Sequence, residues 1–382
     1  MNVKRERWQI VIAGLIIGPY CLGIFQESDA AVTDVLTDVA LGFIAFSIGG
    51  EFRISNIKQI GTSSITITFF QACLATLLVD AALLACGFPA PLSLTLGAIA
   101  AATAPAATLM VVRQYHAKGE VTSTLLPVVA MDDAVGLMLF SIFLPISQAL
   151  ASNATLTVTS MLLQPLLEIV LSLAVGAGIG LLIALAMRFF HSKVNRISVA
   201  VAAVLLGSAL ASIWNLSSLL LCMAIGAVLV NLRNDADELL EITDAWTPPL
   251  FMLFFVLSGA ELDLAVVPTV GLLGVVYMVA RSLGKYFGSF LGATIAKSSP
   301  NIRKYLGLTL LPQAGVAIGM AQVALNALPE YGTQIQAVVL TATLIYELIG
   351  PVITKLALTA AGEIQDSKKS KAKTEQSAGG AK

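Results

Sequence analysis

Residues 121–150, VTSTLLPVVAMDDAVGLMLFSIFLPISQAL, form an apolar stretch that carries two charges, the adjacent Asp132 and Asp133. About 20 apolar residues are enough for a helix to cross a hydrocarbon core of about 30 Å. A charge at the centre of a bilayer costs about 2.5–3.5 kcal/mol on insertion scales, so charges are kept there mainly for function. The stretch therefore predicts a membrane helix whose two carboxylates have a functional role.

The rest of the chain has the same apolar character. Of its 382 residues, 57% are hydrophobic and 12% are charged, and the mean hydropathy is +0.88. Soluble domains average roughly 25% charged residues. The composition predicts an all-α polytopic membrane protein, and the net charge of −1 gives no sign of nucleic-acid binding. We expect about twelve spans, at 8–25, 33–52, 60–86, 91–112, 121–150, 161–189, 196–213, 216–232, 246–260, 267–295, 303–327 and 333–359.

The basic residues indicate the orientation of these spans. If the spans alternate, all but two of the 22 Lys and Arg residues lie on one side of the membrane, and the loops of the other side contain none. The positive-inside rule makes the basic side cytoplasmic, so we expect both termini there. The two exceptions are Arg281 and Lys285, which are four residues apart within span 267–295 and so share one helix face.

The intramembrane charges have two interpretations. Asp132, Asp133, Arg281 and Lys285 could form ion pairs that hold helices together. That explains one Asp–Lys pair, but not two adjacent carboxylates, because neighbours on a helix point about 100° apart. A buried carboxylate that holds either a proton or an alkali cation, but not both, meets the minimum requirement for exchange. If Lys285 loses its carboxylate partner and its proton when a cation enters, one cation is linked to two protons.

Two of the predicted spans are interrupted, in ATAPAATLM (102–110) and in LPQAGVAIG (311–319). Proline removes a backbone donor and clashes with the preceding turn. Interrupted helices in both halves of a transporter indicate an ion site near the middle of the membrane, where free backbone groups face a cavity instead of lipid. The residues that we expect at these breaks are Thr103, Pro105, Pro312, Gln313 and Gly315.

Several of these motifs together resemble a known family. MDDAVG (131–136), ARSLGK (280–285), LLPQAGVAIGMA (310–321) and LIYELIGP (344–351) resemble the bacterial sodium/proton antiporters of the second monovalent cation:proton antiporter family, the NapA-like and Kef-like group. The early segments GLIIGP and LGFIAFSIGGEF are also similar to its first helices, so the resemblance extends over nearly the whole membrane region.

The resemblance implies an inverted repeat with two crossed, interrupted helices, an elevator mechanism and a homodimer. It implies a single transporter domain over residues 1–360. The polar, lysine-rich and small-residue-rich composition of residues 361–382 predicts a disordered cytoplasmic tail. The expected parts of the domain are a mobile core (60–150 and 267–359), a dimerisation scaffold (8–52 and 196–260) and a linker helix (161–189).

The motif match also implies roles for single residues. Asp133 is expected to be the ion-binding carboxylate and Asp132 the partner of Lys285. With Thr103 as an additional ligand, the two aspartates would bind Na⁺.

Two further family positions are expected to be structural. Arg281 and Glu347 match the family's arginine and acidic positions, and we expect them to pair with each other. The chain departs from the family in the fourth span, where TAPAAT replaces a signature that often reads TSxxIT. Cation selectivity therefore does not follow from the resemblance.

The predicted function is antiport of Na⁺ or Li⁺ for protons in the inner membrane of a bacterium, electrogenic, with no enzymatic activity and no cofactor. K⁺/H⁺ antiport is an alternative. Sodium-coupled symport of an organic anion on the same fold is another, although it would not ordinarily need the Asp–Lys constellation. An intramembrane aspartyl protease needs one carboxylate on each of two facing helices, whereas both are on one helix here.

Overall fold

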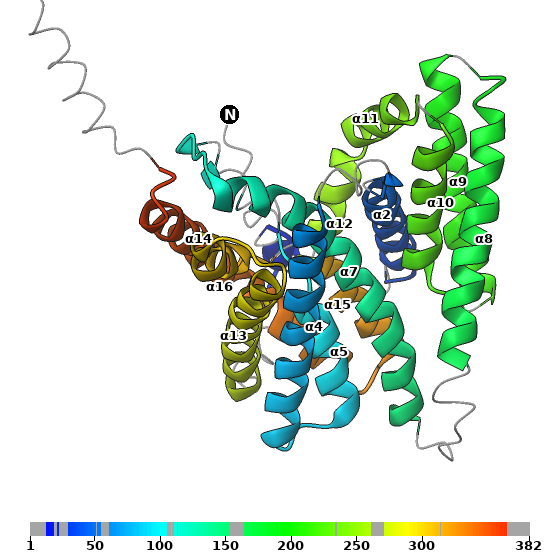
Figure 1. Cartoon of the computed structure of the whole chain (residues 1–382). Helices are drawn as coiled ribbons and strands as arrows, with labels where there is room; N and C mark the ends of the chain where they lie inside the picture. Colours follow the sequence, from blue (N-terminus) through cyan, green and yellow to red (C-terminus); the bar gives the residue numbers. More distant parts are fainter. Residues whose placement is uncertain are drawn as a thin grey trace, which may run out of the picture.

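The structure is a computed structural model that describes residues 13–18, 21–22, 30–50, 52–54, 61–104, 108, 111–112, 114–152, 164–190, 192–214, 216–233, 235–260, 271–313 and 315–364. Within these residues the chain is helical and contains no strand (Figure 1). The elements are α2 (Ala30–Gly50), α4 (Thr62–Ala85), α5 (Ala90–Ala100), α7 (Glu120–Ala151), α8 (Gln164–Ala186), α9 (Lys193–Trp214), α10 (Ser218–Leu232), α11 (Ala236–Trp246), α12 (Pro248–Ala260), α13 (Gly271–Ile295), α14 (Pro300–Tyr305), the 3₁₀ helix η3 (Leu306–Leu310), α15 (Gly315–Ala327) and α16 (Gly332–Ala360).

Several helices are long and apolar enough to cross a bilayer. In the described part of the chain, five meet this criterion: Thr62–Ala85, Glu120–Ala151, Leu167–Ala186, Lys193–Trp214 and Gly332–Ala360. The segments Pro300–Leu310 and Gly315–Ala327, bent by 50° at the break between them, make a sixth if they form one span. The predicted multi-pass membrane protein is thus confirmed, while the count of twelve spans and the side of the termini stay predictions.

Two helices end inside predicted spans. In span 91–112, α5 ends at Ala100 and the chain runs without helix through Ala104. In span 303–327, η3 ends at Leu310 and residues 311–313 are not helical. Pro312, which cannot donate a backbone hydrogen bond, lies in this second gap. Pro105 lies outside the described residues.

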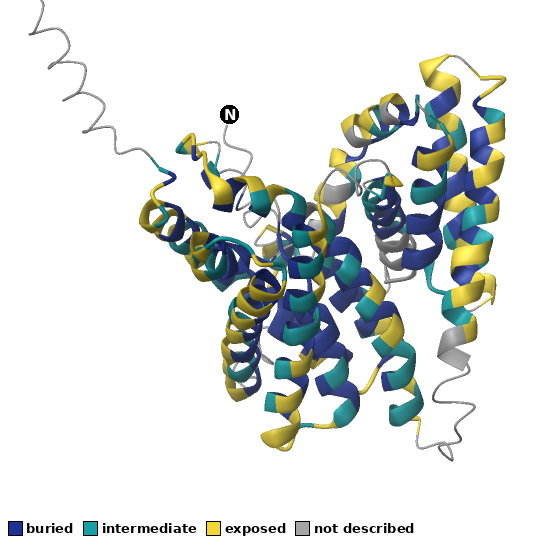
Figure 2. Cartoon of the chain, in the orientation of Figure 1, coloured by how far each residue is buried: buried dark blue, intermediate teal, exposed yellow. Residues whose placement is uncertain are grey.

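The helices pack in two groups (Figure 1). One group contains α4, α5, α7, α13, η3, α15 and α16, and the other contains α2, α8, α9, α10 and α12. Helix α7 contacts α2, α8 and α10 and therefore lies where the groups meet. Exposed residues follow the outer sides of α8, α9 and α13, as expected of helices that face lipid (Figure 2).

A row of glycines lets α13 approach α4 closely. Gly284, Gly288 and Gly292 are four residues apart and lie on one face of α13, against the backbone of α4. A Cβ atom at Gly288 would lie 2.6 Å from the Cα atom of Gln71. Small residues commonly permit such backbone contact between membrane helices. This packing brings Lys285, next to Gly284 on α13, within reach of groups on α4 and α7.

The end of α16 is tied to the start of α7. Glu363, which is 8% exposed, accepts hydrogen bonds from the Val121 amide (2.6 Å), the Thr122 amide (2.8 Å) and the Thr122 hydroxyl (2.7 Å). The first amides of a helix have no partner within it, so the carboxylate satisfies two of them. The prediction of a disordered tail from residue 361 is therefore wrong for residues 361–364, because these residues pack on the domain. Residues 365–382 lie outside the described part.

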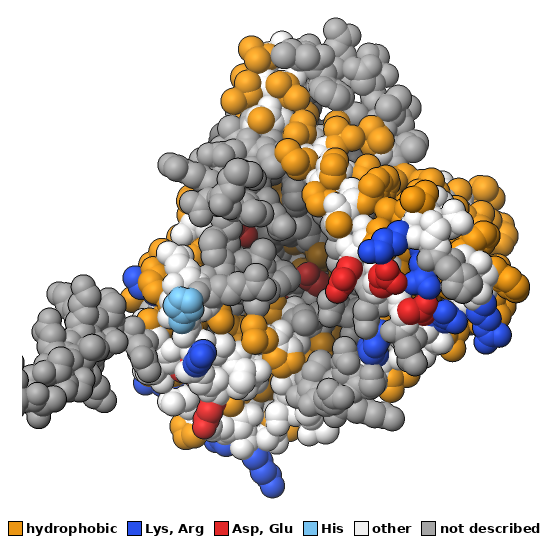
Figure 3. Space-filling view, turned by 90° about the horizontal axis from the view of Figure 1, so that it is seen from above, with side chains coloured by type: hydrophobic (Ala, Val, Ile, Leu, Met, Phe, Trp, Pro, Cys, Tyr) orange, Lys and Arg blue, Asp and Glu red, His pale blue; other side chains and the backbone are white. Residues whose placement is uncertain are grey.

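Lys and Arg side chains gather at one end of the molecule, over α9, α10 and α11 (Figure 3). There Arg196, which is 7% exposed, pairs with Asp235 (2.7 Å) and Glu238 (3.0 Å). Arg233 lies 2.9 Å from Asp235, and its hydrogen bond holds the pKa of that carboxyl below the usual range. These contacts link the connection between α10 and α12 to the start of α9.

Candidate ion-binding site

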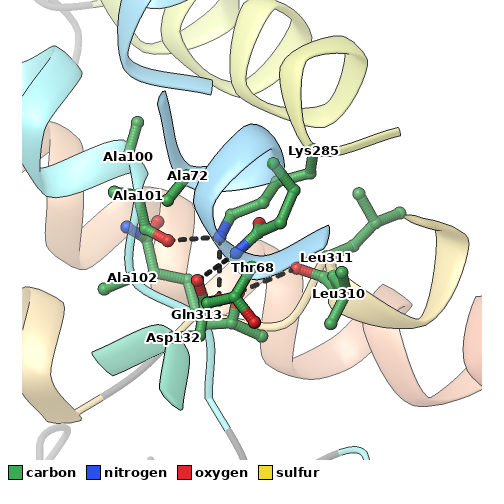
Figure 4. Close-up of polar contacts among 12 residues, drawn as sticks. Thr68, Ala72, Ala100, Ala101, Ala102, Asp132, Lys285, Leu310, Leu311 and Gln313 are labelled. Atoms are coloured by element: carbon green, nitrogen blue, oxygen red, sulfur yellow. Dashed lines mark hydrogen bonds and ion pairs between the residues drawn. The ribbon is translucent and has the colours of Figure 1, made fainter. Parts of the chain in front are cut away.

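Helices α7 and α13 bring Asp132 and Lys285 into contact. The Lys285 Nζ lies 2.9 Å from the Asp132 Oδ2, and both side chains are fully buried. The other Asp132 oxygen accepts a hydrogen bond from the Gln71 amide on α4, and the Lys285 ammonium also donates to the Ala101 carbonyl (Figure 4). The pair is therefore neutralised within the protein, and both of its partners have further hydrogen bonds.

Asp133 differs from its neighbour. It is buried, with 9% of its surface exposed, yet none of the hydrogen bonds or ion pairs among the described residues involves its carboxylate. Because it points about 100° away from Asp132 around α7, it does not share the Lys285 ammonium. Asp132 and Lys285 still act on it electrostatically. Its oxygens are thus available for a proton or a cation.

The non-helical segment after α5 lies against the break before α15. The Ala104 amide donates to the Pro312 carbonyl (2.8 Å), and the Thr103 hydroxyl donates to the Leu310 carbonyl (3.2 Å). The two non-helical segments 101–104 and 311–313 therefore lie side by side, although they are far apart in sequence. A hydroxyl that donates one hydrogen bond keeps oxygen lone pairs, so Thr103 retains the capacity to bind a cation.

Arg281 holds these segments together from α13. Its guanidinium is fully buried and donates to three carbonyls, those of Ala100 (3.1 Å), Ala102 (2.7 Å) and Leu311 (2.7 Å). It also lies 4.6 Å from the centre of the Tyr346 ring, a cation–π contact with α16. Both breaks expose carbonyls that helices would otherwise use, and Arg281 satisfies some of them.

The expected pairing of Arg281 with Glu347 is absent from the ion pairs of the described residues. The physical reason is the direction of α16. Tyr346 is the residue that faces α13, and its hydroxyl donates to the Met278 carbonyl (2.7 Å). Its neighbour Glu347 points about 100° away around the helix.

Gln313, in the second break, also has a fixed position. Its side-chain amide donates to the Ile99 carbonyl (3.2 Å) and to the Tyr277 hydroxyl (2.8 Å), and both side chains are fully buried. Gln313 therefore links the end of α5 to α13, while Gly315 begins α15.

Three residues of this site had no role in our sequence analysis: Gln71, Tyr277 and Tyr346. Gln71 gives a signal in hindsight, because it is an amide within the apolar segment TFFQACLAT (68–76). Tyr277 and Tyr346 give none, since aromatic residues are common in membrane helices.

The chemistry of the site suits a small, hard cation. Asp132, Asp133, the Thr103 hydroxyl and the backbone carbonyls of the two non-helical segments all offer oxygen. Across the described residues, no group of three or more His, Cys, Asp and Glu side chains is placed to hold a metal ion. Oxygen ligands favour hard cations over transition metals.

A buried, unpaired carboxylate beside a buried Asp–Lys pair, in a chain with several helices long and apolar enough to cross a bilayer, is typical of secondary transporters. The chain belongs to the sodium/hydrogen exchanger family, whose transmembrane model matches residues 9–360. Its fold is similar to that of the sodium proton antiporter MjNhaP1 from Methanocaldococcus jannaschii, solved at pH 8, with a TM-score of 0.69, 23% identity and coverage of 94% of this chain and 92% of that one. A second MjNhaP1 structure, from electron microscopy, gives a TM-score of 0.67 with 20% identity over the same shares. The search of curated proteins finds no match.

Proposed function

We propose that the protein exchanges Na⁺ or Li⁺ for protons across a membrane, and that Asp133 is the carboxylate that the two ions occupy in turn. The observation that carries this assignment is the unpaired, nearly buried Asp133 carboxylate beside the Asp132–Lys285 pair. The membership of the chain in the sodium/hydrogen exchanger family supports the same assignment.

The pair gives the exchange its stoichiometry. A cation that enters between Asp132 and Asp133 competes with the Lys285 ammonium for Asp132. Two unit charges 4 Å apart interact by about 4 kcal/mol at an effective dielectric constant of 20, so this competition is strong. Lys285 then releases a proton, Asp133 releases another, and one cation replaces two protons. Such an exchange moves net charge and responds to membrane potential.

The two groups of helices suit an elevator mechanism. The group that contains α4, α7, α13 and α15 would move, with the site, against the group that contains α2 and α10. The second group would form the interface of a homodimer. The Lys and Arg side chains at one end support a cytoplasmic position of that end (Figure 3). A cytoplasmic position of both termini follows from the alternation of the predicted spans, and the inner membrane of a bacterium follows from the family resemblance.

The assignment is tested in proteoliposomes with an imposed pH gradient and a fluorescent pH probe. We expect Na⁺ to dissipate the gradient with the wild type, and Asp133→Asn to reduce the response to that of empty liposomes. Glu120→Gln is the matched control, because Glu120 is an exposed carboxylate on the same helix. Full activity of Asp133→Asn would contradict the assignment.

The same assay decides the substrate. Titration with Na⁺, Li⁺ and K⁺ should give responses to the first two ions. A response to K⁺ alone would favour the K⁺/H⁺ alternative. Sodium-driven uptake of an organic anion without dissipation of the pH gradient would favour a symporter.

A further inference from the structure

A cavity of about 330 Å³ lies between the two groups of helices. Its walls come from α7 and α15 on one side and from α8 and the start of α10 on the other. Its lining residues on α7 lie between Phe140 and Gln148, toward the C-terminal end of that helix, whereas Lys118 precedes its first residue. By the orientation proposed above, this is the outer side of the membrane.

The cavity contains one charged side chain among the described residues that line it, Glu168 of α8. No Lys, Arg or His of the described part pairs with this carboxylate. The surrounding polar groups are Ser141, Gln148, Ser217 and Ser218. An acidic residue in an otherwise apolar membrane helix normally faces a water-filled space or a partner, and here it faces the cavity.

The cavity lies along the same face of α7 that carries Asp133. On α7, Asp133, Leu137, Ser141 and Gln148 recur at helical spacing on one side. Ser141 and Gln148 line the cavity, whereas Leu137 is 1% exposed and lies between it and the ion site. The cavity thus ends about two helical turns from Asp133.

A hydrogen bond joins the two groups of helices at the same place. The Ser141 hydroxyl of α7 lies 3.3 Å from the Ser217 hydroxyl, which caps α10. The Ser217 amide donates to the Ser172 hydroxyl, which in turn donates to the carbonyl of Glu168 (3.0 and 2.6 Å). The backbone that carries Glu168 is therefore held in register with α10.

We propose that Glu168 binds a hydrated monovalent cation in this cavity, as an outer station from which the ion passes along α7 to Asp133. The inference rests on the proposed exchange function and adds to it a second binding residue. The cavity has room for an ion with several of its water molecules, whose oxygens the serine and glutamine side chains can replace in part. A single carboxylate in a recess with apolar walls concentrates cations there and repels anions.

The charge of the cavity can be tested by labelling a cysteine in its wall, in an experiment that does not depend on transport activity. Ser218→Cys, in a background with the exposed Cys21 and Cys86 changed to Ser, places a thiol in its wall. We expect a membrane-impermeant cationic thiol reagent, added from outside, to react several-fold faster than an anionic one of similar size. Na⁺ should slow the cationic reagent more than the bulky cation N-methylglucamine does at equal ionic strength.

Glu168→Gln should remove both the faster reaction of the cationic thiol reagent and its slowing by Na⁺. Glu330→Gln, which removes an exposed carboxylate from the loop after α15, should leave both in place. If the thiol of the Ser218→Cys variant does not react from outside, or if the preference is unchanged in Glu168→Gln, the proposal is overturned.

Transport gives the second measurement. In oriented vesicles, Glu168→Gln should raise the KM for Na⁺ several-fold on the outer side and leave the cytoplasmic KM unchanged. An equal change on both sides would contradict an outer station. If the wild type shows no Na⁺/H⁺ exchange, the proposed function fails, and the labelling result still decides whether Glu168 binds the cation.

Discussion

Lys285 and Asp132 form a fully buried ion pair, with 2.9 Å between Nζ and Oδ2, that joins α13 to α7. A buried pair adds little stability over an apolar one, because both charges lose their water. Removal of one partner is different, since it leaves an uncompensated charge inside the protein. The pair is thus best explained by a role in transport, in which Lys285 leaves Asp132 and releases a proton when a cation binds.

Replacement of the lysine tests this explanation. Lys285→Gln should lower the free energy of unfolding by about 3–5 kcal/mol, because Asp132 is left without a cation. If the variant still transports Na⁺, the exchange should carry one proton per cation and lose its dependence on membrane potential. The measurement is Na⁺ transport with the potential clamped by K⁺ and valinomycin.

The double variant Asp132→Asn/Lys285→Gln supplies the control for stability. It removes both charges and should unfold at a higher temperature than Lys285→Gln alone, since the pair is coupled. Voltage dependence that persists in Lys285→Gln would show that the lysine carries no proton.

A separate prediction concerns Arg281, which holds the two non-helical segments together. Arg281→Lys keeps the charge but loses the planar fork that reaches the carbonyls of Ala100, Ala102 and Leu311. A hydrogen bond from a charged group contributes about 1.5–3 kcal/mol, so the loss of two should lower the unfolding free energy by about 3 kcal/mol or more. Thermal unfolding in detergent measures the effect. Arg303→Lys is the control near a membrane surface, and an equal, small change in both variants would refute a structural role for Arg281.

The row of glycines on α13 predicts that alanine substitutions at two glycines of this helix have different effects. Gly288→Ala adds a Cβ 2.6 Å from the Gln71 Cα, so α13 must move away from α4 and take Lys285 with it. We expect a lower unfolding temperature and a loss of Na⁺/H⁺ exchange. Gly274→Ala is the matched control, because nothing lies within 4 Å of its added Cβ. A stable, active Gly288→Ala protein would show that the close approach is dispensable.

The sequence indicated those parts of the site where a residue is unfavourable in an apolar helix, namely the buried charges and the prolines. Two carboxylates and an amine in apolar helices require partners, so an Asp–Lys contact could be expected from the sequence, and the family resemblance named Asp132 as the partner of Lys285. The breaks at 102–110 and 311–319 were visible for a similar reason, since proline cannot continue a helix.

The remaining contacts have no comparable signal. Arg281 binds backbone carbonyls, which every residue possesses. The sequence therefore does not indicate that Arg281 binds these carbonyls and not a carboxylate such as that of Glu347. The Glu363 carboxylate meets the Thr122 amide of α7 across a separation of 241 positions, and its segment reads as the start of a polar tail. In each case most of the partners are main-chain groups, which a pattern of side chains does not reveal.

The tie between Glu363 and α7 is itself testable. Glu363→Gln leaves one acceptor oxygen and turns an amide donor toward amides that also donate, so at least one N–H at the start of α7 loses its partner. An unsatisfied buried donor costs about 1–3 kcal/mol, and the free energy of unfolding should fall by that amount. Glu120→Gln, at an exposed carboxylate in the first turn of the same helix, should change it by no more than about 0.5 kcal/mol. Equal stability of the two variants would show that the α16 end does not hold α7, and a loss in Glu363→Gln alone would show that the helix that carries Asp132 and Asp133 is anchored there.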